Sequence, residues 1–346
     1  MNVYELNSDK KFDNKKIKKF CAFPKIHLIL LLIITLMANI TNAQNDVKIV
    51  GLYNLGSTSP EGGSHLFVLE NGNFAITYFG GIKTGKWEKA KRNTYIFTPN
   101  KKEIEFELFG RHNKDLKGDI KISFNGFEES QTFIQLRREK EEDYNMQQVF
   151  NTDANCFSYP YVYLFNKIAN SISFMSITYG KENSSIITFK NTEGYNDFIS
   201  SYIEIDTYEN QAFFATFKGN QLYFEDDNFA QRTTLDEDSE DVKFINIFID
   251  KEMNQDTIYL NPSYNMFGAP DSEEENQDIN EHYVFNEQKN AFIDASQYIE
   301  GSENIKSDES FDNMSIIYAY KALKKYTKKS VKYKINEKPL FQVNCD

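Results

Sequence analysis

Short apolar runs that alternate with polar residues recur along the chain, and they constrain its fold more than any other feature. In Lys102–Phe109, three apolar residues alternate with three glutamates. A period of two places one face of a strand in the core and the other in water. Asp119–Phe124 repeats the pattern, and turn residues separate such runs at intervals of about 8–12 residues. This spacing predicts a β-rich chain that begins with an antiparallel β-barrel or sandwich.

Two Gly/Asn dipeptides predict tight hairpins, because these residues adopt the positive backbone angles that two-residue turns require. Asn71-Gly72 separates two apolar runs in the first half of the chain. Gly219-Asn220 separates Ala212–Lys218 from Gln221–Glu225. We therefore expect antiparallel strand pairs in both halves.

The second half also carries helical spacing. Five apolar residues between Tyr195 and Ile203 fall at i, i+3, i+4, i+7 and i+8, which predicts an amphipathic helix. Ile316–Tyr326 keeps a similar spacing, with a strand at Ser315–Tyr320 as the alternative. Phe244–Ile249 is a further candidate strand.

These patterns divide the chain into four parts. Residues 1–43 are a signal peptide, 44–138 an all-β domain, 139–155 a polar linker, and 156–346 an α+β domain with acidic loops. The expected fold class is thus β-rich, with an N-terminal barrel or sandwich followed by an α+β domain.

The first part of this plan resembles a known family. Residues 46–138 are similar to the lipocalin-like β-domains that recur in exported bacterial proteins. The resemblance lies in Gly51-Leu52-Tyr53, Phe67, Glu70-Asn71-Gly72-Asn73-Phe74, Gly85-Lys86-Trp87 and Tyr95-Ile96-Phe97. It implies a barrel, and it carries over no binding residue.

The N-terminus reads as an export signal. Seven lysines precede an apolar run at Leu28–Ala38, and the small residues Thr41 and Ala43 follow it. This order predicts cleavage between Ala43 and Gln44, which would make the protein secreted or periplasmic. The alternative is an uncleaved membrane anchor. No later apolar run approaches the length that spans a bilayer.

Charge and cysteine content limit the partners. The net charge is −12, and the basic signal makes the remainder more acidic still, which argues against nucleic acid or anionic lipid as a partner. The charge is uneven, because Glu225–Asp312 is strongly acidic and Asn313–Asp346 carries eight lysines. After cleavage only Cys156 and Cys345 remain, and two thiols in an oxidising compartment predict one disulfide. Two free, buried thiols are the alternative.

No residue pattern predicts catalysis, a cofactor or a metal site. The acids from Asp236 begin like a Ca²⁺ loop, but its sixth and twelfth places hold Asp241 and Ile247. The stretch Gly56–His65 combines Ser, Gly and His, and we interpret it as a surface loop. We therefore predict a non-catalytic binding or structural protein of the envelope, with a small apolar ligand or an envelope protein as partner. A secreted hydrolase built from scattered acids and histidines, and an acidic adhesion module, are the alternatives.

Overall fold

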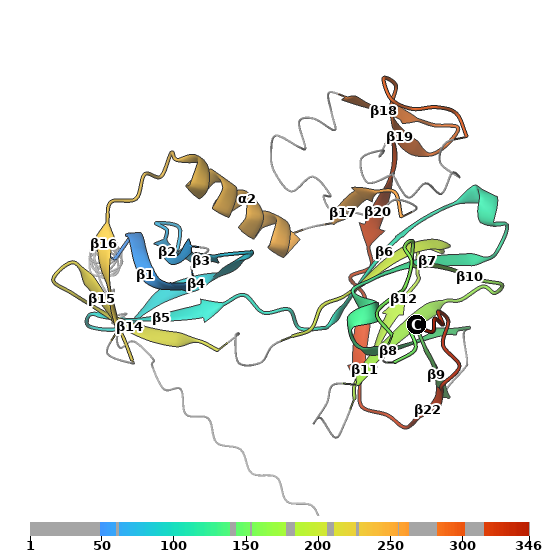
Figure 1. Cartoon of the computed structure of the whole chain (residues 1–346), viewed down its shortest axis with the longest axis horizontal. Coiled ribbons are helices and arrows are strands. Elements are labelled where there is room, and N and C mark those ends of the chain that lie inside the picture. The colour runs from blue at the N-terminus through green and yellow to red at the C-terminus, as the bar shows by residue number, and fades with distance from the viewer. Residues whose placement is uncertain are drawn as a thin grey trace, which may run out of the picture. The chain divides into compact units, whose positions relative to one another are not determined.

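The structure is a computed structural model, shown in Figure 1. It describes residues 49–59, 62–138, 143–152, 154–177, 184–205, 211–225, 228–254, 256–262, 282–301 and 315–345. The predicted signal peptide at 1–43, with its cut between Ala43 and Gln44, lies outside the described residues. So do parts of the acidic stretch Glu225–Asp312, chiefly 263–281 and 302–312.

The described residues are dominated by β-structure, as the alternating pattern predicts. They form a closed barrel and two further sheets, and their one α-helix is α2 (Glu240–Asn254). In this part of the chain, no helix has the length and apolar character needed to cross a bilayer.

The barrel is closed by eight antiparallel strands that come from two distant parts of the sequence (Figure 1). Around the barrel the order is β1-β16-β15-β14-β5-β4-β3-β2. The strands are β1 (Gly51–Ser59), β2 (Gly62–Val68), β3 (Asn73–Tyr78), β4 (Gly81–Lys91), β5 (Thr94–Pro99), β14 (Phe213–Lys218), β15 (Gln221–Phe224) and β16 (Phe229–Thr233). The predicted hairpins at Asn71-Gly72 and Gly219-Asn220 are confirmed, because they join β2 to β3 and β14 to β15.

Aromatic rings fill the side of the barrel wall that faces inward. Phe97 stacks on Phe213 with ring centroids 4.9 Å apart, and Phe74 meets Phe97 edge-on at 5.3 Å. Trp87 lies opposite Phe97 across the β4–β5 ladder and donates its indole N–H to the Leu69 carbonyl at 2.9 Å.

The opposite side of the wall is covered by α2. Phe67, Leu69 and Ala75 face outward from the barrel and pack against Val242 and Ile245 of the helix. The continuous apolar run from Leu66 to Leu69 follows from this arrangement, because β2 is buried on both faces. The expected strand at Phe244–Ile249 is wrong, since its apolar residues belong to the helix that covers the barrel.

Shortening a side chain in this contact tests how firmly the helix is docked. We expect Val242→Ala to lower the free energy of unfolding of the barrel by about 2 kcal/mol, because Val242 is fully buried and two methyl groups are lost. Urea unfolding followed by fluorescence of Trp87, the chain's one tryptophan, measures the change. Lys243→Ala, at an exposed position of the same helix, is the matched control and should leave the unfolding midpoint in place.

A second sheet has eight strands, in the order β10-β7-β13-β6-β20-β19-β18, with β17 also paired to β20. Neighbours are antiparallel except for β13 and β7, which run parallel. The strands are β6 (Phe106–Arg111), β7 (Ile120–Asn125), β10 (Val162–Phe165), β13 (Asp197–Tyr202), β17 (Thr257–Leu260), β18 (Tyr283–Asn286), β19 (Ala291–Asp294) and β20 (Ile316–Ala322).

The third sheet has six strands, in the order β21-β12-β11-β8-β9-β22. They are β8 (Gln131–Arg137), β9 (Tyr144–Gln148), β11 (Ser171–Ile177), β12 (Ile186–Lys190), β21 (Tyr326–Lys329) and β22 (Tyr333–Asn336). Both edges of this sheet therefore come from the lysine-rich end of the chain. Lysines on an edge strand discourage pairing with other chains, so the lysines of β21 and β22 have a structural role.

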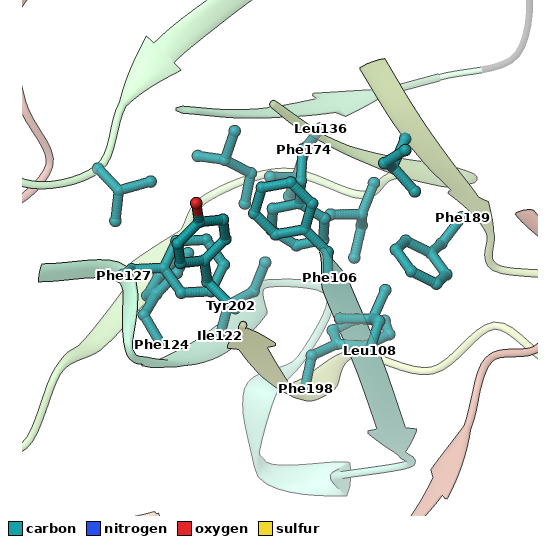
Figure 2. Close-up of a cluster of buried hydrophobic side chains, with 14 of the residues drawn as sticks. Phe106, Leu108, Ile122, Phe124, Phe127, Leu136, Phe174, Phe189, Phe198 and Tyr202 are labelled. Atoms are coloured by element: carbon teal, nitrogen blue, oxygen red, sulfur yellow. The ribbon is translucent and has the colours of Figure 1, made fainter. Parts of the chain in front are cut away.

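The main hydrophobic core lies where these two sheets face each other. Figure 2 shows Phe106, Phe198 and Phe124 of the eight-stranded sheet meeting Phe174 and Phe189 of the six-stranded sheet. Phe106 and Phe174 are stacked with centroids 5.3 Å apart, and both are fully buried. The richness of the sequence in Phe and Tyr is thus used to fill a β-sandwich core.

The C-terminal segment crosses from one edge of the six-stranded sheet to the other and is fixed there. Phe341 stacks on Phe150 at 4.7 Å, and Asn151 bonds to the backbone of Val343 through both its amide nitrogen and its amide oxygen. Cys156 and Cys345 then lie at disulfide-bonding distance, with their Cα atoms 5.8 Å apart. The predicted cysteine pair is therefore present in the structure.

Two predictions about the second half need correction. The predicted helix from Tyr195 to Ile203 is wrong, since Asp197–Tyr202 is strand β13 at the centre of a sheet. Phe198 points into the sandwich core and Ile199 into a cluster on the other face, so burial on both faces hides the alternation of a strand. For Ile316–Tyr326, the strand alternative holds.

The sequence predicts an N-terminal barrel followed by an α+β domain, and the observed sheets do not follow this division. The barrel takes strands from 51–99 and from 213–233, whereas β6, β7 and β8 leave it for the other two sheets. The expected linker at 139–155 contains β9, which pairs with β8 and β22. The predicted boundaries therefore do not separate the sheets, because a local pattern shows that a strand forms but not its partner.

Candidate functional site

A buried ionic cluster lies where β6 ends beside the start of β13. Arg111 Nη2 is 2.7 Å from Asp197 Oδ2, and Arg111 Nε donates to the same oxygen at 2.8 Å. Lys121 Nζ lies 3.1 Å from this oxygen, and Asn113 Nδ2 donates to it at 3.0 Å. Asp197 is fully buried, and its Oδ1 has no hydrogen-bond partner in the described part of the chain.

Tyrosine rings of β20 complete the cluster. The Arg111 guanidinium lies 3.7 Å from the centre of the Tyr318 ring and 5.4 Å from that of Tyr320. Burial opposes the charged guanidinium, yet its interactions with Tyr320 and Asp197 raise the pKa of Arg111 above its ordinary value. Burial likewise raises the pKa of Tyr320 well above its ordinary value. Because its carboxylate is sealed from solvent, we interpret the cluster as a clamp between strands β6, β7, β13 and β20.

Beside this clamp opens a hollow of about 350 Å³, which we call the His112 hollow. Ile120, Ile168 and Ala169 form its apolar wall, and the His112 and Tyr195 rings meet edge-on with centroids 4.9 Å apart. Ile168 is 61% exposed, so its side chain is open to solvent. The volume is in the range of small-molecule sites.

Asparagines around the His112 hollow hold its loops in place. Asn191 accepts from the Tyr195 N–H at 2.9 Å and donates to the Tyr195 carbonyl at 2.8 Å. Asn196 bonds to both backbone groups of Asn113, at 2.7 and 2.8 Å. The side-chain amides of Asn191 and Asn196 therefore hold the loop at 190–196 in place. The His112 ring, the Tyr195 ring and the apolar wall are among the groups that can contact a ligand.

A second hollow, of about 550 Å³, lies against the same loop, and we call it the lysine hollow. Its lining includes four lysines, Lys190, Lys321, Lys324 and Lys325, together with Tyr195 and the buried Leu323. Backbone bonds assemble it, because the Lys190 N–H donates to the Lys325 carbonyl at 3.0 Å and the Ala322 N–H to the Asp256 carbonyl at 2.9 Å. Tyr195 thus lines both hollows.

The protonation of Tyr195 suits it to this position. Burial and, after it, the charge of Glu193 raise the pKa of the Tyr195 hydroxyl above its ordinary value. Tyrosine is already protonated at neutral pH, and this shift does not change that, so the hydroxyl can donate a hydrogen bond to a ligand.

Comparison with protein-family models, curated proteins and solved structures found no match. The function is therefore argued from the geometry of the two hollows, since a fold by itself does not specify an activity.

Of the three histidines beyond residue 43, only His112 lines either of these hollows. His65 is in strand β2, opposite Asn54 and Thr77. The surface-loop interpretation of Gly56–His65 is wrong for its described residues, because 56–59 lie in β1 and 62–65 in β2. His282 immediately precedes β18. Among the described residues, no group of three or more His, Cys, Asp or Glu side chains could hold a metal ion.

The acids that begin like a Ca²⁺ loop have a capping role. Asp236 Oδ1 accepts from the Asp238 N–H at 3.1 Å, and the Ser239 hydroxyl accepts from the Val242 N–H at 3.4 Å. These contacts form the turn that starts α2, whose first turn holds Glu240 and Asp241. Acids at a helix N-terminus stabilise it through the helix dipole, which accounts for the cluster.

Sequence reasoning missed the loop at 190–196 and the lysines that meet it. The lysine-rich C-terminus was a signal, but its position against Lys190 depends on strand pairing between β12 and β21. The ionic cluster was missed for the same reason, because Arg111 and Asp197 meet only through the pairing of β6 with β13.

Proposed function

We propose that this protein is an exported, non-catalytic binding protein of the cell envelope, secreted or periplasmic after loss of its signal peptide. The cysteine pair supports an oxidising compartment, where disulfides persist. The basic, apolar and small-residue order of the N-terminus supports export. The closed barrel supports a relation to lipocalin-like domains, although its rings leave the ligand to be bound elsewhere.

The observation that carries the proposal is the His112 hollow. It combines an apolar wall in which Ile168 is exposed, two aromatic rings and a loop fixed by asparagine bonds, which is the usual make-up of a preformed small-molecule site. The ligand's apolar part would lie against Ile168 and the Tyr195 ring.

Native mass spectrometry of the protein from its own source tests this role. We expect a bound small molecule on the wild-type protein and its loss in Ile168→Asp, because a carboxylate in the apolar wall disfavours apolar contact. Ile168 is exposed, so this substitution should spare the fold. Ile299→Asp is the matched control, since Ile299 is 71% exposed and does not line the hollow, and it should keep the adduct. A wild-type protein without an adduct, or one retained in Ile168→Asp, contradicts the proposal.

A further inference from the structure

We propose that the lysine hollow is an anion-binding site, and that it takes a part of the ligand carrying at least two negative charges as phosphate or carboxylate groups. This inference rests on the binding role proposed above and names the chemistry of what is bound.

The charges around the hollow support this assignment. Its four lysines face two acids, Glu193 and Asp256, so the lining carries a net charge of two positive units in a chain whose net charge is −12. Lys324 is already paired with Asp256. Lys190, Lys321 and Lys325 have no ion-pair partner in the described part of the chain, and they surround the same space. Three unpaired ammonium groups repel one another, and a multivalent anion relieves that repulsion.

The lysines of the hollow lie at different places in the fold from the lysines that protect the edges of the six-stranded sheet. Lys329 lies on β21 and Lys334 on β22, at the two edges of the six-stranded sheet, where charge prevents edge-to-edge pairing. Lys321 lies one residue before the end of β20, whereas Lys324 and Lys325 lie in the connection between β20 and β21. Edge protection does not explain why these three gather with Lys190 of another strand.

The hollow also offers groups that complement a charged ligand. Tyr195 belongs to its lining, and a protonated tyrosine hydroxyl can donate to an anionic oxygen. Leu323, which is buried, also belongs to the lining. Because the lysines are exposed, binding should weaken as salt rises.

Isothermal titration of the full mature chain at low ionic strength tests the site with two probes, inorganic pyrophosphate and citrate. We expect at least one to bind, and Lys321→Gln/Lys325→Gln to weaken that binding about tenfold. The matched variant Lys329→Gln/Lys334→Gln removes the same charge from the sheet edges and should change affinity less than about twofold. Asp256→Asn should tighten binding, because it removes an acid from the lining and releases Lys324.

The probes also separate the two possible sources of negative charge. Binding of pyrophosphate alone assigns a phosphate ligand, binding of citrate alone assigns a carboxylate ligand, and binding of both assigns a site for either. Equal weakening by the two double-lysine variants, or no binding of either probe, would overturn the proposal. If the anion-binding proposal fails, the Ile168→Asp experiment still tests the proposed function, because Ile168 does not line the lysine hollow.

Discussion

Removing the covalent link between Cys156 and Cys345 is expected to lower the free energy of unfolding by about 4–5 kcal/mol. The two cysteines are 189 residues apart, so the bond closes a very long loop and removes much conformational freedom from the unfolded chain. The loss should appear in Cys156→Ser/Cys345→Ser as a lower urea midpoint.

The same substitution should loosen one part of the molecule before the rest. Residues 326–345 supply both edges of the six-stranded sheet, and the cysteine pair fixes their far end. Hydrogen exchange should therefore rise first in β22 and in the Leu340–Val343 stretch that bonds to Gln148, Val149 and Asn151. The oxidised wild-type protein is the control. Equal stability and equal exchange in the two proteins would show that the bond does not hold this segment.

Replacing Asp197 by alanine is the second large change, with an expected loss of about 3–5 kcal/mol. The substitution leaves Arg111 buried beside Lys121 with no carboxylate to neutralise either charge. Arg111 is only 7% exposed, so its guanidinium cannot recover solvation without opening the sheet. Urea unfolding followed by near-ultraviolet circular dichroism, which reports the surrounding tyrosines, measures the loss.

Two further variants complete this experiment: one is a control, and the other should restore the lost stability. Glu107→Ala breaks the Lys102–Glu107 pair, which has a 2.8 Å contact but lies on the surface, and should cost less than about 1 kcal/mol. Arg111→Met/Asp197→Leu replaces both charges with apolar groups and should recover most of the stability lost in Asp197→Ala. If the single Asp197 variant is no less stable than the Glu107 variant, the cluster is not a clamp.

The sequence predicts short-range features of this fold well, but it does not predict which strands pair across long stretches of chain. The hairpins at Asn71-Gly72 and Gly219-Asn220 follow from two-residue turn chemistry, and both are present. The cysteine pair could be predicted by counting, because only two cysteines lie beyond the N-terminal segment. The assembly of the barrel could not be predicted. Strand β5 pairs with β14 across more than a hundred residues, and the sequence of neither strand indicates which strand it pairs with.

The candidate site shows the same limit. The residues around Tyr195 come from five separate stretches of chain. They meet only through long-range strand pairings, among them those of β12 with β21, β13 with β6 and β17 with β20. The exposed Ile168 and the gathered lysines become visible as a site only in three dimensions. Central strands such as β13 add a further difficulty, because burial on both faces removes the period-two signal and imitates a helix.

One measurement tests the central claim of an exported, disulfide-closed binding protein most directly. It is the intact mass of the unreduced protein recovered from its own source. The account predicts a chain that begins at Gln44 and is lighter by two hydrogens than its reduced form, owing to the Cys156–Cys345 bond. A mass that retains residues 1–43 would contradict export by a cleaved signal, and a mature mass unchanged by reduction would contradict the disulfide.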